Sequence, residues 1–95
     1  MSRVVCEGAV EVRIRRKPAD RYVRRITRLL AESGADRVVV KARGRGINRA
    51  VDIVEAVRRH LEAKVQVEDL AINIVKTHDA NRRPAEIAIC LKRVQ

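Results

Sequence analysis

Apolar residues along the chain either alternate with charged residues or recur every three to four positions, and each pattern predicts a different element. Alternation over residues 9–15, 65–76 and 87–91 is typical of half-buried strands, and the β-branched run at 37–42 predicts a further, central strand. Helical spacing over residues 18–32 and 47–63 predicts two amphipathic helices. The chain therefore alternates strands and helices before it ends in two strands.

The resulting order, βαβαββ, predicts an α/β fold, more narrowly α+β: a two-layer sandwich in which two helices cover one face of a four-stranded sheet. The last two strands are expected to form an extended hairpin, because residues 77–84 make a longer connection than a hairpin requires. A shift in the alternation at Asp69 indicates a bulge in the third strand. Pro18 suits the start of the first helix, and Ser33-Gly34 suits its end.

The side chains that must fill the core are almost all aliphatic. The chain has 15 Val, 8 Ile and 5 Leu, and Tyr22 is its only aromatic residue. One aromatic side chain cannot build the stacking platform with which many single-strand readers hold bases. Length predicts one domain over residues 1–95. No apolar run approaches the about 18 residues of a membrane span, and charges interrupt the N-terminus, so we expect a cytoplasmic protein with no membrane partner.

The cysteines and histidines are too few to predict a metal centre. Cys6 and Cys90 are far apart without a CxxC spacing, and the chain has only two histidines, so we expect no metal and no cofactor. For a cytosolic chain the default expectation is two buried thiols. The alternative is a disulfide between Cys6 and Cys90, which occurs in cytosolic proteins of hyperthermophiles.

The charge of the chain is large and unevenly placed. Twenty-two Lys and Arg against 12 Asp and Glu leave a net charge of +10, of which residues 1–49 carry +9 (14 bases, 5 acids) and residues 50–95 carry +1 (8 bases, 7 acids). Seventeen of the bases are Arg, whose planar guanidinium binds phosphate oxygens in pairs. A polyanionic partner is therefore expected. The alternative is that the charged residues form networks of ion pairs that stabilise the protein against heat. Such networks explain the balanced charges of residues 50–95 better than the excess of bases in residues 1–49.

Three basic clusters lie at predicted turns and are the candidate nucleic-acid contacts. They are Arg13, Arg15, Arg16 and Lys17; Lys41, Arg43, Arg45 and Arg49, with Asn48 as a hydrogen-bonding partner; and Arg82 with Arg83. Gly44 and Gly46 would let a phosphate approach the start of the second helix, or they only shape a turn while Asn48 caps the helix. Charge asymmetry favours ligand contact for the clusters. The remaining basic face of the first helix could equally be solvated: Arg21, Arg24, Arg25 and Arg28.

The residues from Lys41 to Glu55, KARGRGINRAVDIVE, resemble the signature of the Alba family of small archaeal chromatin proteins. Arg16-Lys17-Pro18 is similar to the basic pair before the first helix of that family, and the similarity spans residues 10–93 in the same element order. The resemblance implies a homodimer whose basic hairpin arms reach along the minor groove. It also implies a body that lies across duplex DNA or structured RNA with little sequence preference.

The resemblance assigns nucleic-acid contacts to basic residues in three places. Arg16 and Lys17 match the basic pair, Arg43 and Arg45 match the contacts of the body, and Arg82 and Arg83 match the arm by position and charge. One base of the pair is acetylated in some relatives. Because Arg16 cannot be acetylated, Lys17 is the residue of the pair that acetylation could modify. Many relatives carry an aromatic residue near the end of the second helix for contacts between dimers, where this chain has His60 and Leu61.

We therefore expect a chromatin protein that binds double-stranded DNA irrespective of sequence and coats or compacts it, associated with the chromosome. The alternative is a protein that binds structured RNA, of the ribonuclease P or tRNA-associated subunit type. Catalysis and a small-molecule substrate are not expected, because His78 and Asp79 supply only half of a metal-dependent site. A third class, binding to anionic lipid through the basic first helix, conflicts with the need for its apolar stripe in the core.

Overall fold

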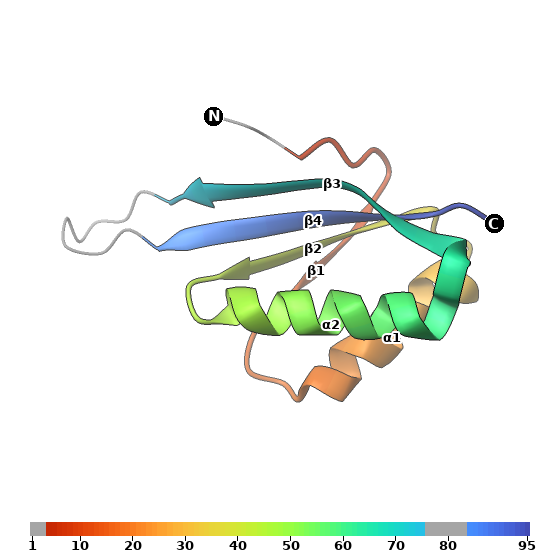
Figure 1. Cartoon of the computed structure of the whole chain (residues 1–95), viewed down its shortest axis with the longest axis horizontal. Helices are drawn as coiled ribbons and strands as arrows, with labels where there is room; N and C mark the ends of the chain where they lie inside the picture. Colours follow the sequence, from red (N-terminus) through yellow and green to blue (C-terminus); the bar gives the residue numbers. More distant parts are fainter. Residues whose placement is uncertain (1–3, 76–83) are drawn as a thin grey trace.

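The computed structural model describes residues 4–75 and 84–95, and its elements follow the predicted order (Figure 1). They are β1 (Val10–Arg13), α1 (Ala19–Ala31), β2 (Arg37–Arg43), α2 (Gly46–Leu61), a short 3-10 helix (Glu62–Lys64), β3 (Val65–Ile74) and β4 (Ala85–Arg93). Each element lies within a few residues of its predicted range. The 3-10 turn after Leu61 ends α2 slightly earlier than the apolar spacing predicts.

The four strands form one mixed sheet in the order β1-β2-β4-β3. β1 and β2 are parallel, which the intervening helix allows, whereas β4 is antiparallel to both β2 and β3. α1 and α2 pack against each other on the same face of this sheet (Figure 1). The predicted fold class, a two-layer α+β sandwich with two helices on one face of a four-stranded sheet, is confirmed.

Local sequence signals set both ends of α1. Pro18 has φ −56° and ψ 145° and directly precedes the first helical residue, where its fixed φ is favourable. At the other end, Gly34 adopts φ +75°, a left-handed conformation that a residue with a Cβ rarely takes. The N–H of Ser33 then bonds back to the Arg28 carbonyl at 3.0 Å. The predicted start and stop of this helix are therefore confirmed.

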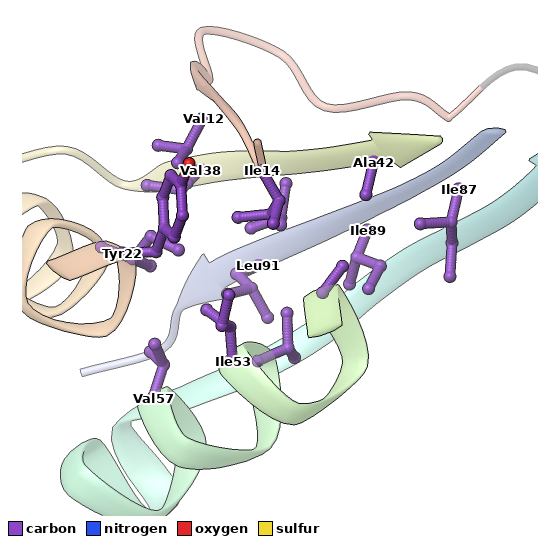
Figure 2. Close-up of a cluster of buried hydrophobic side chains, with 14 of the residues drawn as sticks. Val12, Ile14, Tyr22, Val38, Ala42, Ile53, Val57, Ile87, Ile89 and Leu91 are labelled. Atoms are coloured by element: carbon purple, nitrogen blue, oxygen red, sulfur yellow. The ribbon is translucent and has the colours of Figure 1, made fainter. Parts of the chain in front are cut away.

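The core lies between the sheet and the two helices (Figure 2). No polar or charged residue is fully buried in the described part of the chain. The core side chains come from both helices and from the inward face of the strands, and they include Val12, Ile14, Tyr22, Ile26, Leu30, Val38, Val40, Ile53, Val57, Ile87, Ile89 and Leu91. Aliphatic residues thus close a core that has no Phe or Trp.

One detail of the α2 stripe differs from the prediction. The apolar spacing over residues 47–63 predicts that Val51 lies on the core side of the second helix. In the structure Val51 is 41% exposed, whereas Ile53 is 1% exposed. The buried residues Ala50, Ile53, Val54 and Val57 follow the spacing i, i+3, i+4, i+7 of a single helix face. Val51 lies outside that spacing, so its prediction is wrong.

The apolar residues of β3 form an exposed stripe, here called the β3 stripe. It consists of Val67, Leu70, Ile72 and Ile74, which are 36%, 48%, 56% and 68% exposed. Ile72 pairs with the core residue Ile87 of β4, so the stripe faces the helix side of the sheet. The helices leave this edge uncovered. The predicted bulge is present, since the register against β4 shifts between Val67 and Asp69.

The residues before β1 cross the face of the sheet that the helices leave open (Figure 1). Cys6 in this segment forms a disulfide with Cys90 of β4, with a Cα–Cα distance of 5.7 Å. The N–H of Val5 also donates to Asp69 Oδ2 at 3.2 Å. The default expectation of two buried thiols is therefore wrong, and the alternative, a disulfide between Cys6 and Cys90, is the one present. The bridge ties the N-terminal segment to an inner strand of the sheet.

Removing the disulfide is expected to lower the free energy of unfolding. A cross-link between residues 84 positions apart restricts the unfolded chain by up to about 4.5 kcal/mol in the chain-entropy model, and measured effects are usually smaller. We expect Cys6→Ser/Cys90→Ala to lose about 2–4 kcal/mol in urea unfolding. Reductant should shift the wild-type midpoint toward that of the variant and leave the variant unchanged. A wild-type midpoint that does not respond to full reduction contradicts this expectation.

Candidate nucleic-acid interface

Two strand-to-helix turns and the base of the β3–β4 hairpin lie at one end of the sheet (Figure 1). Because β1 and β2 are parallel, both strands end there, and the N–H of Ile14 bonds to the Lys41 carbonyl at 2.8 Å. The N–H of Gly44 bonds to the carbonyl of Ala85, the first residue of β4, at 2.9 Å. We call this region, residues 14–18 and 43–48, the turn end. It brings the first two predicted basic clusters together.

The β1–α1 turn is held from both sides of its backbone. The Tyr22 hydroxyl accepts the N–H groups of Arg15 and Lys17 at 2.8 and 3.3 Å. The Arg49 guanidinium donates to the carbonyls of the same two residues at 2.5 and 2.6 Å. Tyr22 is only 6% exposed, whereas the side chains of Arg15, Arg16 and Lys17 are exposed. Arg49, predicted as a nucleic-acid contact, thus positions the turn on which three other predicted contacts lie.

The β2–α2 turn leaves the start of α2 open to an anion. Gly44 adopts φ +52°, which a side chain would strain, whereas a Cβ on Gly46 would meet Ala42 Cβ at an ordinary 3.5 Å. Gly44 therefore shapes the turn. No side chain caps α2 and its first turn holds no acidic residue, so Asn48 is not a cap. The Ile47 N–H donates to the Gly44 carbonyl at 3.1 Å, and the positive end of the helix dipole lies at Arg45 and the first turn of α2, which contains Asn48.

The predicted contacts Arg13, Lys41 and Arg43 lie on the open face of the sheet and are paired with carboxylates. Glu86 Oε2 lies 2.7 Å from Arg43 Nε and 3.5 Å from Arg13 Nη1. Lys41 Nζ lies 2.9 Å from Glu11 Oε1. The hydrogen bond from Arg43, with the charges of Arg13 and Arg43, lowers the pKa of Glu86, and Lys41 lowers that of Glu11. These three cations are therefore partly neutralised by the protein itself.

The structure divides the predicted site residues into groups. Five lie at the turn end, exposed or partly exposed, and make no side-chain ion pair or hydrogen bond within the described residues: Arg15, Arg16, Lys17, Arg45 and Asn48. Arg82, Arg83, His78 and Asp79 lie outside those residues. Sequence reasoning missed the supporting side chains Tyr22 and Glu86. No local pattern identifies Glu86, because it is 43 positions from Arg43 in the sequence.

Residues 4–75 and 84–95 contain neither a metal-binding cluster nor a helix that could cross a membrane. No three His, Cys, Asp or Glu side chains there are grouped so that they could hold a metal ion. Neither α1 nor α2 has the length and apolar character that crossing a membrane would require, and the same holds for any other helix in that part of the chain.

The family model described as Alba matches residues 10–74 of the chain. Over 64 residues the chain is 47% identical to DNA/RNA-binding protein Alba of Nanoarchaeum equitans, a match that covers 66% of this chain and 70% of that relative. It is 43% identical over 54 residues to DNA/RNA-binding protein Alba 2 of Methanopyrus kandleri, covering 57% of each. It is 44% identical over 57 residues to DNA/RNA-binding protein Alba 1 of Archaeoglobus fulgidus. That match covers 60% of this chain and 63% of the relative, so the chain spans less than two thirds of the last two relatives.

Solved structures share the fold. Alba from Thermoplasma volcanium superposes with a TM-score of 0.80 at 23% identity, over 88% of this chain and 100% of that one. ALBA1 from Trypanosoma brucei superposes with a TM-score of 0.72 at 25% identity, over 87% of this chain and 68% of that one. The two-layer arrangement that gathers the turns is therefore shared with these proteins.

The ion pairs of Glu86 predict an acid-sensitive part of the stability. Because Arg43 and Arg13 hold the pKa of Glu86 below its ordinary value of 4.5, their contribution is complete above that value and is lost as the pH falls through the lowered pKa. Glu86→Gln removes it at every pH. At neutral pH we expect the free energy of unfolding of the variant to be about 1 kcal/mol below that of the wild type. On acidification the free energy of unfolding should fall less for the variant than for the wild type. Urea unfolding at several pH values measures both differences.

Asp20→Asn is the matched control for Glu86→Gln. It breaks the ion pair with Arg24, whose two side chains are 68% and 69% exposed, and such pairs contribute no more than about 0.5 kcal/mol. Equal acid responses of Glu86→Gln and the wild type would show that Glu86 does not stabilise the open face.

Proposed function

The chain belongs to the Alba family, and from this premise we propose that it binds double-stranded DNA through the sugar-phosphate backbone, irrespective of sequence. In this role it associates with the chromosome in the cytoplasm and coats or compacts the DNA. The relatives that it matches are named DNA/RNA-binding proteins. Their names support nucleic-acid binding, and the unpaired cations of the turn end support contact through the sugar-phosphate backbone.

The unpaired cations of the turn end carry this proposal. Arg15, Arg16, Lys17 and Arg45 lack a carboxylate partner within the described residues, and they adjoin the uncapped start of α2. Guanidinium groups bind phosphate oxygens in pairs, and a helix N-terminus adds backbone donors to the same anion. Cations gathered at one end of a chain with a net charge of +10 repel one another. A polyanion offsets that repulsion.

Independence from base sequence follows from the kind of contact. Bonds to phosphate and sugar fix the position of a protein on a duplex but do not distinguish bases. The one aromatic ring, Tyr22, is 6% exposed and its hydroxyl holds the β1–α1 turn, so it does not stack on bases. We include Arg82 and Arg83 as contacts of the hairpin arm. Acetylation of Lys17 would remove one charge from the turn end.

Structured RNA is the second candidate partner, because the matched relatives carry RNA as well as DNA in their names. Phosphate contacts alone do not separate the two, since both polymers present the same anionic groups. Competition between a DNA duplex and a folded RNA of equal length for the same protein decides between them. Binding that favours the folded RNA at every salt concentration would replace duplex DNA as the main partner.

We also propose that the chain works as a homodimer that buries the β3 stripe. The helices leave the β3 stripe uncovered, and Val51 of α2 is a further exposed apolar residue. A two-fold interface buries the same patch on both copies, and exposed apolar stripes of this kind commonly mark such contacts. A dimer would combine two turn ends in one particle and so increase the number of phosphates that it neutralises.

Binding to duplex DNA is expected to weaken steeply with salt. If a dimer neutralises about six phosphates, log K falls against log salt with a slope of roughly −5. Arg45→Ala should weaken binding to all sequences alike and reduce the slope by about one for each phosphate that the variant no longer neutralises. Arg43→Ala should reduce it less, because Glu86 pairs with that guanidinium at 2.7 Å. Fluorescence anisotropy of a labelled duplex at several salt concentrations measures these slopes. Affinity that does not change with salt would refute backbone binding.

A charge in the β3 stripe is expected to separate the dimer. Ile72 is 56% exposed in the single chain, so Ile72→Glu should leave the fold intact while placing a carboxylate in the interface. Sedimentation equilibrium at micromolar concentration should show a dimer for the wild type and a monomer for Ile72→Glu. Val94→Glu, at an exposed apolar residue outside the stripe (42% exposed), should stay dimeric. A wild type that is monomeric at this concentration contradicts the proposal.

A further inference from the structure

We propose that the nucleic-acid-binding surface continues from the β1–α1 turn along the outward face of α1, where Arg21, Arg25 and Arg28 contact the sugar-phosphate backbone of the same DNA duplex. We call these three residues the α1 track. The inference rests on the proposed function and extends it to a helix face that lies outside the turns.

The α1 track carries charge that no carboxylate offsets within the described residues. The one ion pair found there on α1 joins Asp20 to Arg24 at 3.0 Å, and it leaves the three track residues without a partner. Arg21 and Arg25 are four positions apart and Arg25 and Arg28 three, spacings at which like charges on a helix repel. Arg21 also lies near the positive end of the helix dipole. A bound chain of phosphates would turn this repulsion into attraction.

The other helix is arranged differently. The outward face of α2 mixes acids with bases, with Asp52 and Glu55 both exposed. Glu55 Oε1 lies 3.6 Å from Arg58 Nη1, one turn along the helix. A solvated helix face in this protein therefore carries charges of both signs. The near absence of acids from the outward face of α1 sets this helix apart.

Two shallow hollows join the α1 track to the turn end. The first, of about 810 Å³, is lined by Arg15 and Lys17 of the turn together with Arg25. The second, of about 510 Å³, is lined by Lys17, Arg21, Arg25 and Arg28. Lys17 and Arg25 line both hollows, so the basic surface is continuous from the turn to the helix. A sugar-phosphate strand bound at the turn can therefore extend over α1 while it stays on this basic surface.

An anionic lipid surface fits this helix less well. Helices that lie on membranes insert an apolar face between the lipids while their bases contact the headgroups. The apolar face of α1 is already used, because Tyr22, Ile26 and Leu30 are at most 6% exposed and belong to the core. Its outward face offers mainly arginine side chains, which suit a phosphate backbone.

A pair of charge-matched double variants tests the α1 track. Arg25→Gln/Arg28→Gln removes two track residues, and Arg58→Gln/Arg59→Gln removes two exposed bases from α2. Both variants lower the net charge by two and keep a good helix former at each position. Binding of each to a labelled DNA duplex is measured between about 50 and 200 mM salt, with circular dichroism and urea unfolding to verify the fold.

The α1 variant is expected to reduce the salt slope by about two for each protomer that contacts the duplex, one for each phosphate that it no longer neutralises, and the α2 variant to change it far less. Equal reductions in the two variants would attribute the effect to overall charge and overturn the α1 track while leaving the proposed function standing. A wild type that does not bind the duplex overturns both. The proposal would also be overturned if the wild type were retained on phosphatidylserine vesicles, the α1 variant were not, and the salt slope for DNA were the same in both. That result would assign the α1 track to lipid binding.

Discussion

The parallel pairing of β1 with β2 is the constraint on which the rest of the molecule depends. Parallel neighbours must be joined by a crossover, here α1, and their ends then lie at the same edge of the sheet. Both strand-to-helix turns are therefore brought together. Because β4 runs antiparallel to β2, its first residue, Ala85, meets the β2–α2 turn at that edge. With antiparallel pairing of β1 and β2, the two basic turns would lie at opposite ends.

Gathering cations at one end creates repulsion, which carboxylates on the open face offset in part. On the open face, Glu86 and Glu11 pair with the bases of the strands, so that Arg43 and Lys41 add little uncompensated charge. At the β1–α1 turn no carboxylate of the described residues pairs with the cations, and the backbone is held by the Tyr22 hydroxyl and the Arg49 guanidinium. The unpaired cations Arg15, Arg16 and Lys17 therefore lie on a turn whose backbone is held in place. Rigid support reduces the entropy that a ligand contact must overcome.

Much of this arrangement follows from patterns that extend over a few residues. Alternation and helical spacing predict the elements, and Gly34 and the irregularity at Asp69 predict a helix end and a bulge. Contacts between distant residues could not be predicted in this way: the disulfide joins positions 84 apart, and Glu86 meets Arg43 across neighbouring strands. Arg49 illustrates the limit for the site. Its charge predicts a phosphate contact, whereas its position on α2 places it beneath the β1–α1 turn.

The most direct test of this account follows the backbone amide chemical shifts while a short DNA duplex is titrated into the protein at low salt. Because the parallel strands place the unpaired cations at one end, the largest changes should fall on residues 15–17 and 44–48. Residues 61–65 and 93–95, at the opposite end of the sheet, should change little. Shifts of equal size at both ends, or larger ones at residues 61–65, would contradict the claim that the turn end is the binding surface.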